Sequence, residues 1–480
     1  MKAALNSRIR LDIRLKRRSG GALHRQIYER LRADILEGRL EPGRRLASSR
    51  ALASQLGVAR GTVELAYATL ASEGYVETQA AGGTLVASNL SRQRPIPRGR
   101  RIQPVRAFLD PAFDTAQPKP FQMGLPALDL FPRKLWSRLA ARNARRLSLG
   151  ALSYQDAAGD RRLREAIAHY LAIARGLSCS SDQIFVTPGY QGALGLITRV
   201  LLRPGDPVWF EDPGYFLARE ALKQAGAALV PLPVDPEGID VEAGRARAPW
   251  ARFAVVTPSH QAPLGVTLSL NRRLALLAWA AEAGAWVIED DYDSEYRYRG
   301  RPLPALKSLD EANRVLYTGT FSKVLHPGLR LGYLVVPPPE LERFDRAASL
   351  LMPSQGYLDQ MTVADFMTEG HFARHIRRMR QLYAERREAL ATALERRLGD
   401  RLRVDLQAGG LHLLGWLREG SDDEALSQRA WAQGLAPLPL SRAVMQARLP
   451  PALAMSFTNV PVEESAAVVE RMAAVIEGAG

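Results

Sequence analysis

Apolar residues recur at helical spacing in three segments near the N-terminus. In the first, residues 22–38, they fall at every fourth position from Leu23 to Ile35. The second, SSRALASQLG, can be capped by Ser48 or Ser49, and the third, ARGTVELAYATLASEG, follows the glycine that ends it. Because the last two helices are short and are joined by a tight turn, the pattern indicates a helix-turn-helix.

The next segment, YVETQAAGGTLVAS, predicts a β-hairpin beside the helices, which is the wing of a winged helix-turn-helix. In such a module the second helix of the motif begins in the major groove. Arginines and hydroxyl groups around that point are placed for phosphates. The candidate DNA contacts are Arg60, Gly61 and Thr62 on that helix, Arg44, Arg45, Ser48, Ser49 and Arg50 before it, and Gly82 and Thr84 in the wing.

Positive charge is concentrated at the same end of the chain. Residues 1–120 hold 22 Lys and Arg against 10 Asp and Glu, which leaves 43 against 40 for the rest. A phosphate-binding module requires such a basic head, although a solvated basic tail would give the same count. Residues 91–120 are rich in Pro and Arg and predict a linker, whose arginines either attract DNA or only keep it solvated. The expected domains are therefore 1–90 and 121–480.

Beyond residue 120, short apolar runs alternate with amphipathic segments such as residues 271–284. This alternation predicts an α/β domain, a mainly parallel sheet wrapped by helices. From about residue 350, a long charged helix, two or three strands and a final helix predict a smaller α+β lobe. The strands expected in the large lobe are QIFVT (183–187), PVWFED (207–212), AALVPLPV (227–234), RFAVVTP (252–258), AWVIEDD (285–291), RVLYTGT (314–320) and LGYLVV (331–336).

Composition excludes several classes of protein. A chain of 480 residues with 46% hydrophobic and 24% charged residues is globular and long enough for two to four domains. Its single cysteine, Cys179, excludes a disulfide framework and a cysteine-based metal cluster, and no metal site is expected. No apolar run approaches the ~20 residues of a membrane span, and the arginine-rich start lacks the apolar core of a signal peptide. A cytoplasmic protein is expected.

One lysine, Lys323, lies among small hydroxyl residues and glycines in TGTFSKVLHPGLRLGY. A lysine after a strand is usually a surface residue, but a partly desolvated lysine amine can condense with an aldehyde. Pyridoxal phosphate is such an aldehyde, and it also requires a carboxylate at its pyridine nitrogen, a donor to its phenolic oxygen, a phosphate cup and a group against its ring.

The sequence offers a candidate for each of these roles. The strand AWVIE ends at an acidic stretch, EDDYDSEY, which in isolation would be read as a solvated loop, but ligands bind at such strand ends in open α/β sheets. A helix that opens directly after QIFVT offers backbone N–H groups to a phosphate. The candidates are Asp290 for the pyridine nitrogen, Tyr292 for the phenolic oxygen, Gly189, Tyr190, Gln191, Thr320, Ser322 and Arg330 for the phosphate, and Tyr215 for the ring.

The first of these regions, from LHRQIYERL to LASEGYV, resembles the winged helix-turn-helix of GntR-type bacterial repressors. Two positions depart from that family. Ala47 stands where the family usually has proline, and Ala59 stands where a serine usually caps the recognition helix, which should weaken that cap by ~1 kcal/mol. The groove-facing residues are kept, so the resemblance implies DNA binding.

Residues 120–480 resemble the fold-type I aminotransferases in VTPGYQGAL, EDPGY, TPSHQAPLG, VIEDDYDSEYR and GTFSKVLHPGLRLGY. With its GntR-type head, the whole chain resembles the MocR/GabR subfamily of bacterial regulators. The resemblance implies a pyridoxal phosphate-dependent regulator that senses an amino compound, or pyridoxal phosphate itself, through an internal aldimine on Lys323. It also implies a homodimer that binds paired half-sites of double-stranded DNA.

Two further departures bear on catalysis. The enzymes usually place Asn before the proline that is Pro263 here, whereas this chain has Ala262; His260 or Gln261 could compensate, or His260 could be only structural. Where the enzymes place an arginine for the substrate carboxylate, this chain has Ala454; either Arg442 or Arg448 reaches the site instead, or the effector lacks that carboxylate. Ordinary transamination is therefore in doubt. The competing hypotheses are an active aminotransferase with an appended DNA-binding module and a DNA-binding protein whose large domain is only a dimerisation scaffold.

Overall fold

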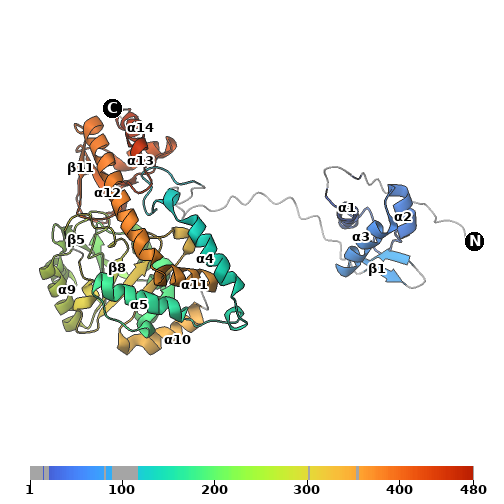
Figure 1. The fold of residues 1–480 in the computed structure, drawn as a ribbon, viewed down its shortest axis with the longest axis horizontal. Coiled ribbons are helices and arrows are strands. Elements are labelled where there is room, and N and C mark those ends of the chain that lie inside the picture. The colour runs from blue at the N-terminus through green and yellow to red at the C-terminus, as the bar shows by residue number, and fades with distance from the viewer. Residues whose placement is uncertain are drawn as a thin grey trace, which may run out of the picture. The chain divides into compact units, whose positions relative to one another are not determined.

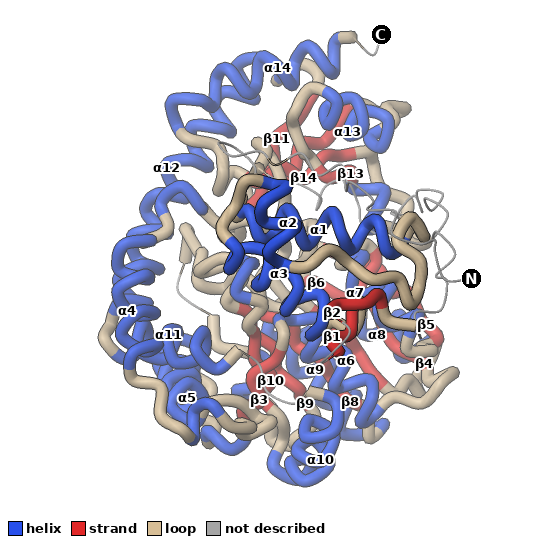
Figure 2. Tube along the Cα trace, turned by 90° about the vertical axis from the view of Figure 1, so that its right-hand side faces the viewer, coloured by secondary structure: helices blue, strands red, loops and turns tan. Residues whose placement is uncertain are grey.

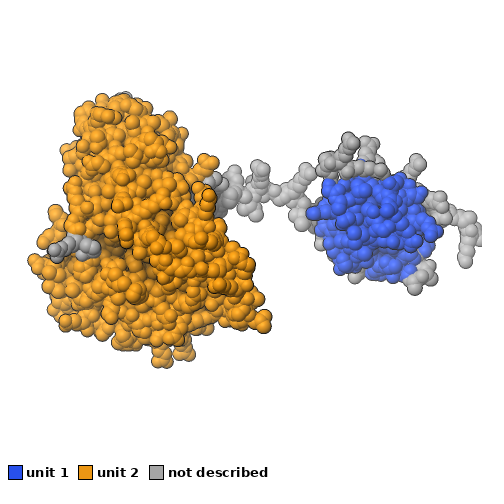
Figure 3. All heavy atoms as spheres, in the orientation of Figure 1, with its two compact units in different colours: residues 1–108 blue, residues 109–480 orange. Residues whose placement is uncertain are grey.

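The computed structural model describes residues 15, 21–79, 83–88, 117–300, 303–352 and 356–478. The chain forms two compact units, residues 1–108 and 109–480, which are coloured separately in Figure 3. The wing candidate Gly82 and most of the expected linker, residues 91–116, lie outside the described residues. None of the described helices is long and apolar enough to cross a membrane.

The first unit, called the head below, is a three-helix bundle with a two-stranded hairpin (Figure 1). Its core includes Ile27, Leu31, Val63 and Leu70, which come from the apolar faces of the first and third helices. The hairpin is antiparallel and pairs Val76 with Val86. The elements are α1 Leu23–Leu36, α2 Ser49–Leu56, α3 Arg60–Ser72, β1 Val76–Gln79 and β2 Gly83–Val86.

The second unit is built around an eight-stranded mixed sheet in the order β3-β10-β9-β8-β7-β4-β5-β6. Its centre, from β9 to β5, is parallel, as expected from the alternation of strands and helices. Strand β10 is antiparallel to both of its neighbours, and β6 is antiparallel to β5. The strands are β3 Ile184–Thr187, β4 Pro207–Asp212, β5 Ala228–Asp235, β6 Gly238–Ile239, β7 Phe253–Val256, β8 Trp286–Asp291, β9 Val315–Thr320 and β10 Gly332–Val335.

Helices cover both faces of this sheet because neighbouring residues of a strand point to opposite faces. In β7, Val255 packs with helices α6, α7 and α10 on one face, whereas Ala254 and Val256 pack with α8 and α9 on the other. The helices are α4 Arg133–Arg145, α5 Arg161–Arg175, α6 Gly189–Leu201, α7 Phe216–Gln224, α8 Val241–Arg247, α9 Leu270–Ala283, α10 Leu341–Leu351 and α11 Tyr357–Thr368.

A smaller lobe follows and contains a four-stranded antiparallel sheet in the order β11-β12-β14-β13. The sequence pattern predicts only two or three of these four strands, because β11 and β13 are short and show little alternation of apolar and polar residues. The elements are α12 His371–Leu398, β11 Leu402–Asp405, β12 His412–Leu417, α13 Asp423–Ala432, β13 Leu438–Pro439, β14 Ala452–Ser456 and α14 Ser465–Glu477.

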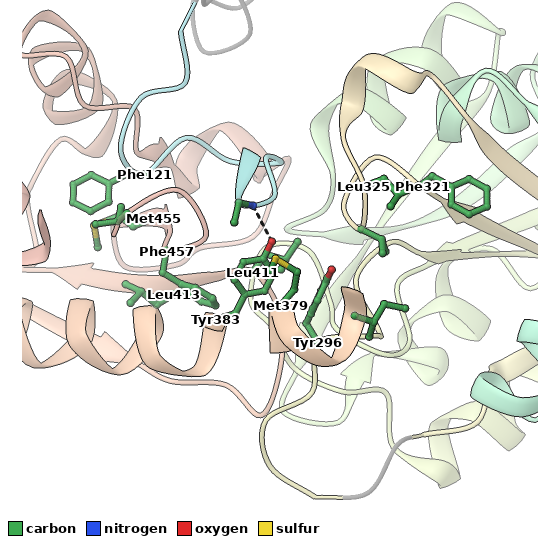
Figure 4. Packing of buried hydrophobic residues seen from close by; sticks show 14 of the residues in the cluster. Phe121, Tyr296, Phe321, Leu325, Met379, Tyr383, Leu411, Leu413, Met455 and Phe457 are labelled. Atoms are coloured by element: carbon green, nitrogen blue, oxygen red, sulfur yellow. Dashed lines mark hydrogen bonds between the residues drawn. The ribbon is translucent and has the colours of Figure 1, made fainter. Parts of the chain in front are cut away.

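Residues 117–131, which we call the strap, tie the start of the second unit to this lobe. Phe121 pairs with Ser456 at the edge of β14. The backbone N–H of Ala127 donates a hydrogen bond to the buried Tyr383 hydroxyl of α12, at 2.8 Å (Figure 4). The core of this region therefore joins residues that are more than 250 positions apart in the sequence.

Candidate functional site

In the head, the N-termini of α2 and α3 carry the candidate DNA contacts. Ser48 is the N-cap of α2, and its side chain accepts a hydrogen bond from the backbone N–H of Ala51 at 3.2 Å. Gly57 ends α2 in the left-handed conformation, at φ 62°, which makes the tight turn into α3. Ala59 is the N-cap of α3 and gives no side-chain hydrogen bond, as its methyl side chain dictates.

Arg60 is exposed on α3 and is already in an ion pair with a carboxylate. The Arg60 Nε atom lies 2.7 Å from Oε1 of Glu64, and the hydroxyl of Ser49 donates to the same oxygen at 3.2 Å. Gly61 has open space around it, and Thr62 is half-buried. Sequence reasoning missed Glu64, although its position one helical turn after Arg60 was the available signal.

The segment before α2 joins the wing. The backbone N–H of Leu46 donates to the Thr84 carbonyl, and the backbone of Arg45 forms an isolated antiparallel β-bridge with that of Leu85. Arg45 and Arg50 are exposed and Arg44 is half-buried. The described DNA candidates thus come from the two helix N-termini and from the base of the wing, so that several can contact one phosphate backbone.

In the second unit, Lys323 lies in a turn directly after β9. Its amine donates a hydrogen bond to the backbone carbonyl of Gly124 in the strap, at 3.0 Å. Burial lowers the pKa of the amine, the neighbouring Arg330 lowers it further, and the carboxylates of Asp290 and Asp293 oppose this. A lysine with a lowered pKa has more of the neutral amine, which is the nucleophilic form.

Asp290 lies at the carboxyl end of β8, on the next strand of the sheet. It is 6% exposed, and burial, with the neighbouring Asp291, raises its pKa well above the usual range of a carboxyl group. Asp291 is already paired with Arg175, at 2.7 Å, and with the Tyr317 hydroxyl. Asp290 is thus the carboxylate of this strand end that a ligand's cationic nitrogen would stabilise.

Tyr292, the first residue after β8, is in contact with His260. The Nδ1 atom of His260 is 3.0 Å from the Tyr292 hydroxyl and also 3.0 Å from Oδ2 of Asp293. The other ring nitrogen, Nε2, is buried without a hydrogen-bond partner among the described residues, and the ring lies against Gly410. His260 thus contacts the candidate phenolic-oxygen donor, and no sequence pattern pointed to Asp293 as its partner.

The expected phosphate cup is formed by residues from three elements. Gly189 begins α6 with φ 74°, and its backbone lies so close to Gly332 of β10 that a side chain at Gly332 would clash. Tyr190 and Gln191 follow in the first turn of α6, where backbone N–H groups lack partners within the helix. From the other side, the half-buried Thr320 and Ser322 flank the turn, where the Thr320 hydroxyl accepts from the Ser322 N–H at 3.1 Å.

Arg330 completes this group. It is one of the non-glycine residues with a positive φ, 50°, and its guanidinium donates to the Pro188 carbonyl at 3.4 Å. That long hydrogen bond brings the guanidinium to the start of α6, and the side chain remains exposed. The left-handed conformation costs energy for an arginine, so the surrounding structure holds it there.

Two aromatic rings line the same region. Tyr215 is the N-cap of α7, and its ring centroid is 6.2 Å from that of Tyr190. The Tyr190 hydroxyl is buried without a partner among the described residues. Burial, followed by the negative charge of Asp290, raises the pKa of both tyrosines, so both hydroxyls are neutral donors.

The buried carboxyl group of Glu211, which no sequence pattern singled out, helps to connect the two loops nearest these rings. Glu211, at the end of β4, accepts hydrogen bonds from the N–H and hydroxyl of Thr257 and from the Gln261 amide. Burial raises its pKa to about 7, although these donors oppose the shift. Gln261 also donates to the Pro213 carbonyl, so it links the loop of Tyr215 to the loop of His260.

The residues present fit pyridoxal phosphate. An amine, a buried carboxyl group and a tyrosine hydroxyl lie at the carboxyl ends of β8 and β9, beside a helix N-terminus whose first N–H groups have no partner within the helix. The buried carboxyl of Asp290 and the unpartnered hydroxyl of Tyr190 are groups that a bound cofactor would stabilise.

The two departures from the enzymes have clear structural positions. The methyl side chain of Ala262 cannot replace the missing amide; only its backbone makes hydrogen bonds, from the N–H to the Thr257 hydroxyl and from the Gln261 amide to the carbonyl. Ala454 is buried in the middle of β14. Of the two alternatives, Arg442 stacks over the ring of Phe216 at 5.0 Å, and Arg448 is exposed just after residues 445–447, whose N–H groups donate to Asp212.

Comparison with known proteins agrees with these observations. Residues 134–471 match the family model for aminotransferase class I and II, and residues 23–86 match that for bacterial regulatory proteins of the gntR family. The chain is 41% identical over 431 residues to the probable rhizopine catabolism regulatory protein MocR of Rhizobium meliloti, which covers 88% of this chain and 87% of that protein. It is 37% identical over 437 residues to the regulator TauR of Rhodobacter capsulatus, with 86% and 88% covered.

Solved structures resemble the second unit. A multiple substrate aminotransferase from Thermococcus profundus has a TM-score of 0.69 and 30% identity and covers 76% of this chain and 93% of that chain. The α-aminoadipate aminotransferase LysN from Thermus thermophilus has a TM-score of 0.68 and 31% identity and covers 75% and 92%. Both similarities extend over nearly the whole length of the enzymes.

Proposed function

The chain belongs to the MocR/GabR subfamily of GntR-type DNA-binding transcriptional regulators, and we propose that its aminotransferase-like unit senses an amine through Lys323. The observation that carries this proposal is the Lys323 amine, which has a lowered pKa, faces Asp290 and has a backbone carbonyl as its hydrogen-bond partner. Lys307 differs in that the Asp310 carboxylate lies 3.8 Å from its amine, in addition to the Val315 carbonyl at 2.6 Å, so its charge has a partner within the fold.

Bound pyridoxal phosphate would supply an aldehyde that condenses reversibly with a primary amine. The chain's own residues have separate tasks in holding it. Asp290 would keep a proton at the pyridine nitrogen, and Tyr292 would donate to the phenolic oxygen. Gly189, Tyr190, Gln191, Thr320, Ser322 and Arg330 would bind the phosphate, and Tyr215 would pack against the ring.

An effector that carries a primary amine would compete with Lys323 for the aldehyde, so the lysine would be released when the effector binds. The amine of Lys323 would then return to the Gly124 carbonyl, which belongs to the strap at the start of the unit. Such an effector changes DNA binding only if it has different affinities for the two states. Candidate effectors are amino compounds, including ω-amino acids, and pyridoxal phosphate itself.

We further propose that the regulator is a homodimer. Leu149, Leu152 and Tyr154 are 88%, 70% and 95% exposed on one short segment of the second unit. Large apolar side chains grouped in this way are typical of a surface that another chain covers. Two heads in a symmetric dimer would bind paired half-sites on duplex DNA.

The alternative is an active aminotransferase with an appended head. It is favoured by the 30% identity, over 74% of this chain, to an aromatic-amino-acid aminotransferase of Thermococcus litoralis. Ala262 and Ala454 weigh against it, because neither can bind a phenolic oxygen or a carboxylate. Steady turnover of an amino donor with a 2-oxo acid would support this alternative.

Borohydride reduction of the protein incubated with pyridoxal phosphate, followed by peptide mapping, tests the proposal. We expect one pyridoxyl adduct, on the half-buried Lys323, and none on the buried Lys307, which serves as an internal control. Amines should then be screened for a change in visible absorbance. Lack of an adduct on Lys323 would leave the large unit as a scaffold.

A further inference from the structure

The second unit has a strongly basic surface that the cofactor site does not use. It lies on α4 and on the first turns of α12, two helices that contain no acidic residue between Arg133 and Arg145 or between His371 and Ala384. We define the α4–α12 basic surface as the exposed cations Arg133, Lys134, Arg138 and Arg145 of α4 and Arg374, Arg377 and Arg378 of α12.

These cations form one stripe on each helix. Along α4 they alternate with the positions that face inward, Trp136, Leu139 and Asn143, and on α12 they alternate with Phe372, His375 and Met379. On α4, Lys134, Arg138 and Arg145 follow one another at spacings of four and seven residues, and on α12 Arg374 is three and four residues from Arg377 and Arg378. Such spacings place side chains on one face of a helix. From Arg133 to Arg145 the α4 stripe is about 18 Å long, at ~1.5 Å per residue.

Both helices pack against the same helix, α11. The ring of Trp136 lies 5.9 Å from that of Phe366 of α11, and Phe366 lies 5.7 Å from the ring of His371 at the start of α12. Figures 1 and 2 both show α4, α11 and α12 on the same side of the second unit. One extended ligand could therefore lie along both stripes.

The cations of this surface are not used in ion pairs. Asp365 of α11 and Glu369 at its C-cap both form ion pairs with Arg142, and Asp365 also forms one with Arg162. Within the described residues, none of the seven defining cations has a carboxylate within 4.0 Å. Like charges that neighbour one another on a helix face repel, and a bound polyanion would offset that repulsion.

We propose that the α4–α12 basic surface binds the phosphate backbone of duplex DNA beside the site that the head occupies. The head holds DNA at a high local concentration for every surface of the same chain, so a weak electrostatic contact is sufficient. Arginine guanidinium groups suit phosphate oxygens, and an exposed, uniformly basic face contacts DNA without reading its sequence. This inference rests on DNA binding by the head and does not depend on amine sensing at Lys323.

The test uses full-length protein and two mixed-sequence duplexes, one of about 20 and one of about 60 base pairs, with affinity measured by fluorescence anisotropy across a salt series. One variant removes three charges from α4 (R133Q, K134Q, R138Q), and a second removes three from α12 (R374Q, R377Q, R378Q). The matched control removes three exposed charges elsewhere in the unit (R199Q, R203Q, R429Q), none of which has an ion pair among the described residues.

Removal of one phosphate-binding cation lowers the slope of log affinity against log salt by about 0.9. We expect a decrease of up to about 2.7 for each stripe variant on the longer duplex, and no decrease on the shorter one or in the control. Slopes equal to those of the parent on both duplexes would overturn the proposal. An equal decrease in the control would show a net-charge effect only, and a change of oligomeric state in sedimentation velocity would make this face an interface between copies; either result also rejects it.

Discussion

In the head, the described DNA candidates lie between Arg44 and Thr84 and are exposed or half-buried, whereas in the second unit Lys323 and its partner Gly124 are 199 residues apart. The head works with charges that water keeps ionised, so its arginines need only be exposed and grouped. The proposed cofactor site relies on groups whose pKa burial perturbs, such as Asp290, and these require a complete core around them. The same chain would thus use a local surface for one ligand and a non-local site for the other.

Because of this difference, substitutions in the head and in the second unit should have different effects. A change in the head should act on one ligand and leave the other site intact, because the candidate cofactor residues all belong to the second unit. A change in the pocket should alter both the cofactor and the stability of the second unit. All seven tryptophans belong to the second unit, so their fluorescence follows its unfolding alone.

The largest expected effect is that of Lys323→Ala. We expect complete loss of the visible absorbance that pyridoxal phosphate gives with the parent protein, because no other described lysine replaces its amine beside Asp290. DNA affinity without effector should stay within about two-fold, since the head is unchanged. A loss of DNA binding comparable to the loss of absorbance would show that the two sites are not separable.

Glu211→Gln should change how stability depends on pH. Burial raises the pKa of Glu211 from 4.5 to about 7, so the folded state holds a proton that the unfolded chain has lost. Its contribution is full below pH 4.5 and is lost as the pH rises through 7, at a cost of up to ~3 kcal/mol. We expect urea unfolding, followed by tryptophan fluorescence, to show the variant gaining stability over the parent between pH 5 and pH 8.

Glu220→Gln is the matched control, because Arg219 and Lys223 hold the pKa of Glu220 below its usual value against the effect of burial. That variant should lose stability at neutral pH, and the loss should shrink as the pH falls below 4.5, which is the opposite sign. If Glu211→Gln shows no gain across the pH series, the carboxyl is ionised in the folded protein and the three donors outweigh burial.

Local pattern was sufficient for most elements and insufficient for the contacts between them. The three helices of the head, and strands such as β4 and β8, begin and end within two residues of the predicted positions, because caps, glycines and apolar runs mark them. Strand β10 pairs antiparallel in a mainly parallel sheet, and nothing in LGYLVV indicates direction.

The same limit applies to the candidate site. The positions of Lys323, Asp290 and Tyr215 at strand ends follow from the order of strands and from motifs. The partners Gly124, Glu211 and Asp293 could not be predicted, since each acts through a contact between distant segments and is an ordinary residue in its own segment. Buried hydrogen bonds of this kind are set by tertiary packing, which periodicity does not encode.

Arg60→Ala tests the surface half of the comparison. Loss of an arginine that contacts a base should cost ~1–3 kcal/mol, which is roughly a 5- to 150-fold loss of affinity for the operator. Visible absorbance with pyridoxal phosphate should not change. Glu64→Gln, which frees Arg60 from its 2.7 Å ion pair, should change affinity less and shift the preferred base, as competition with altered duplexes would measure.

The smallest effect should come from giving α3 the cap that it lacks. Ala59 has the extended backbone of an N-cap, φ −64° and ψ 142°, close to that of Ser48 at the start of α2. A serine there can accept from the N–H of Thr62 and should stabilise the head by ~1 kcal/mol, while Ser48→Ala should destabilise it by a similar amount. Hydrogen exchange of α3 peptides would report both changes, and tryptophan fluorescence should report neither. If Ala59→Ser also raised the stability that fluorescence follows, the two units would unfold together, and the separation on which the comparison rests would fail.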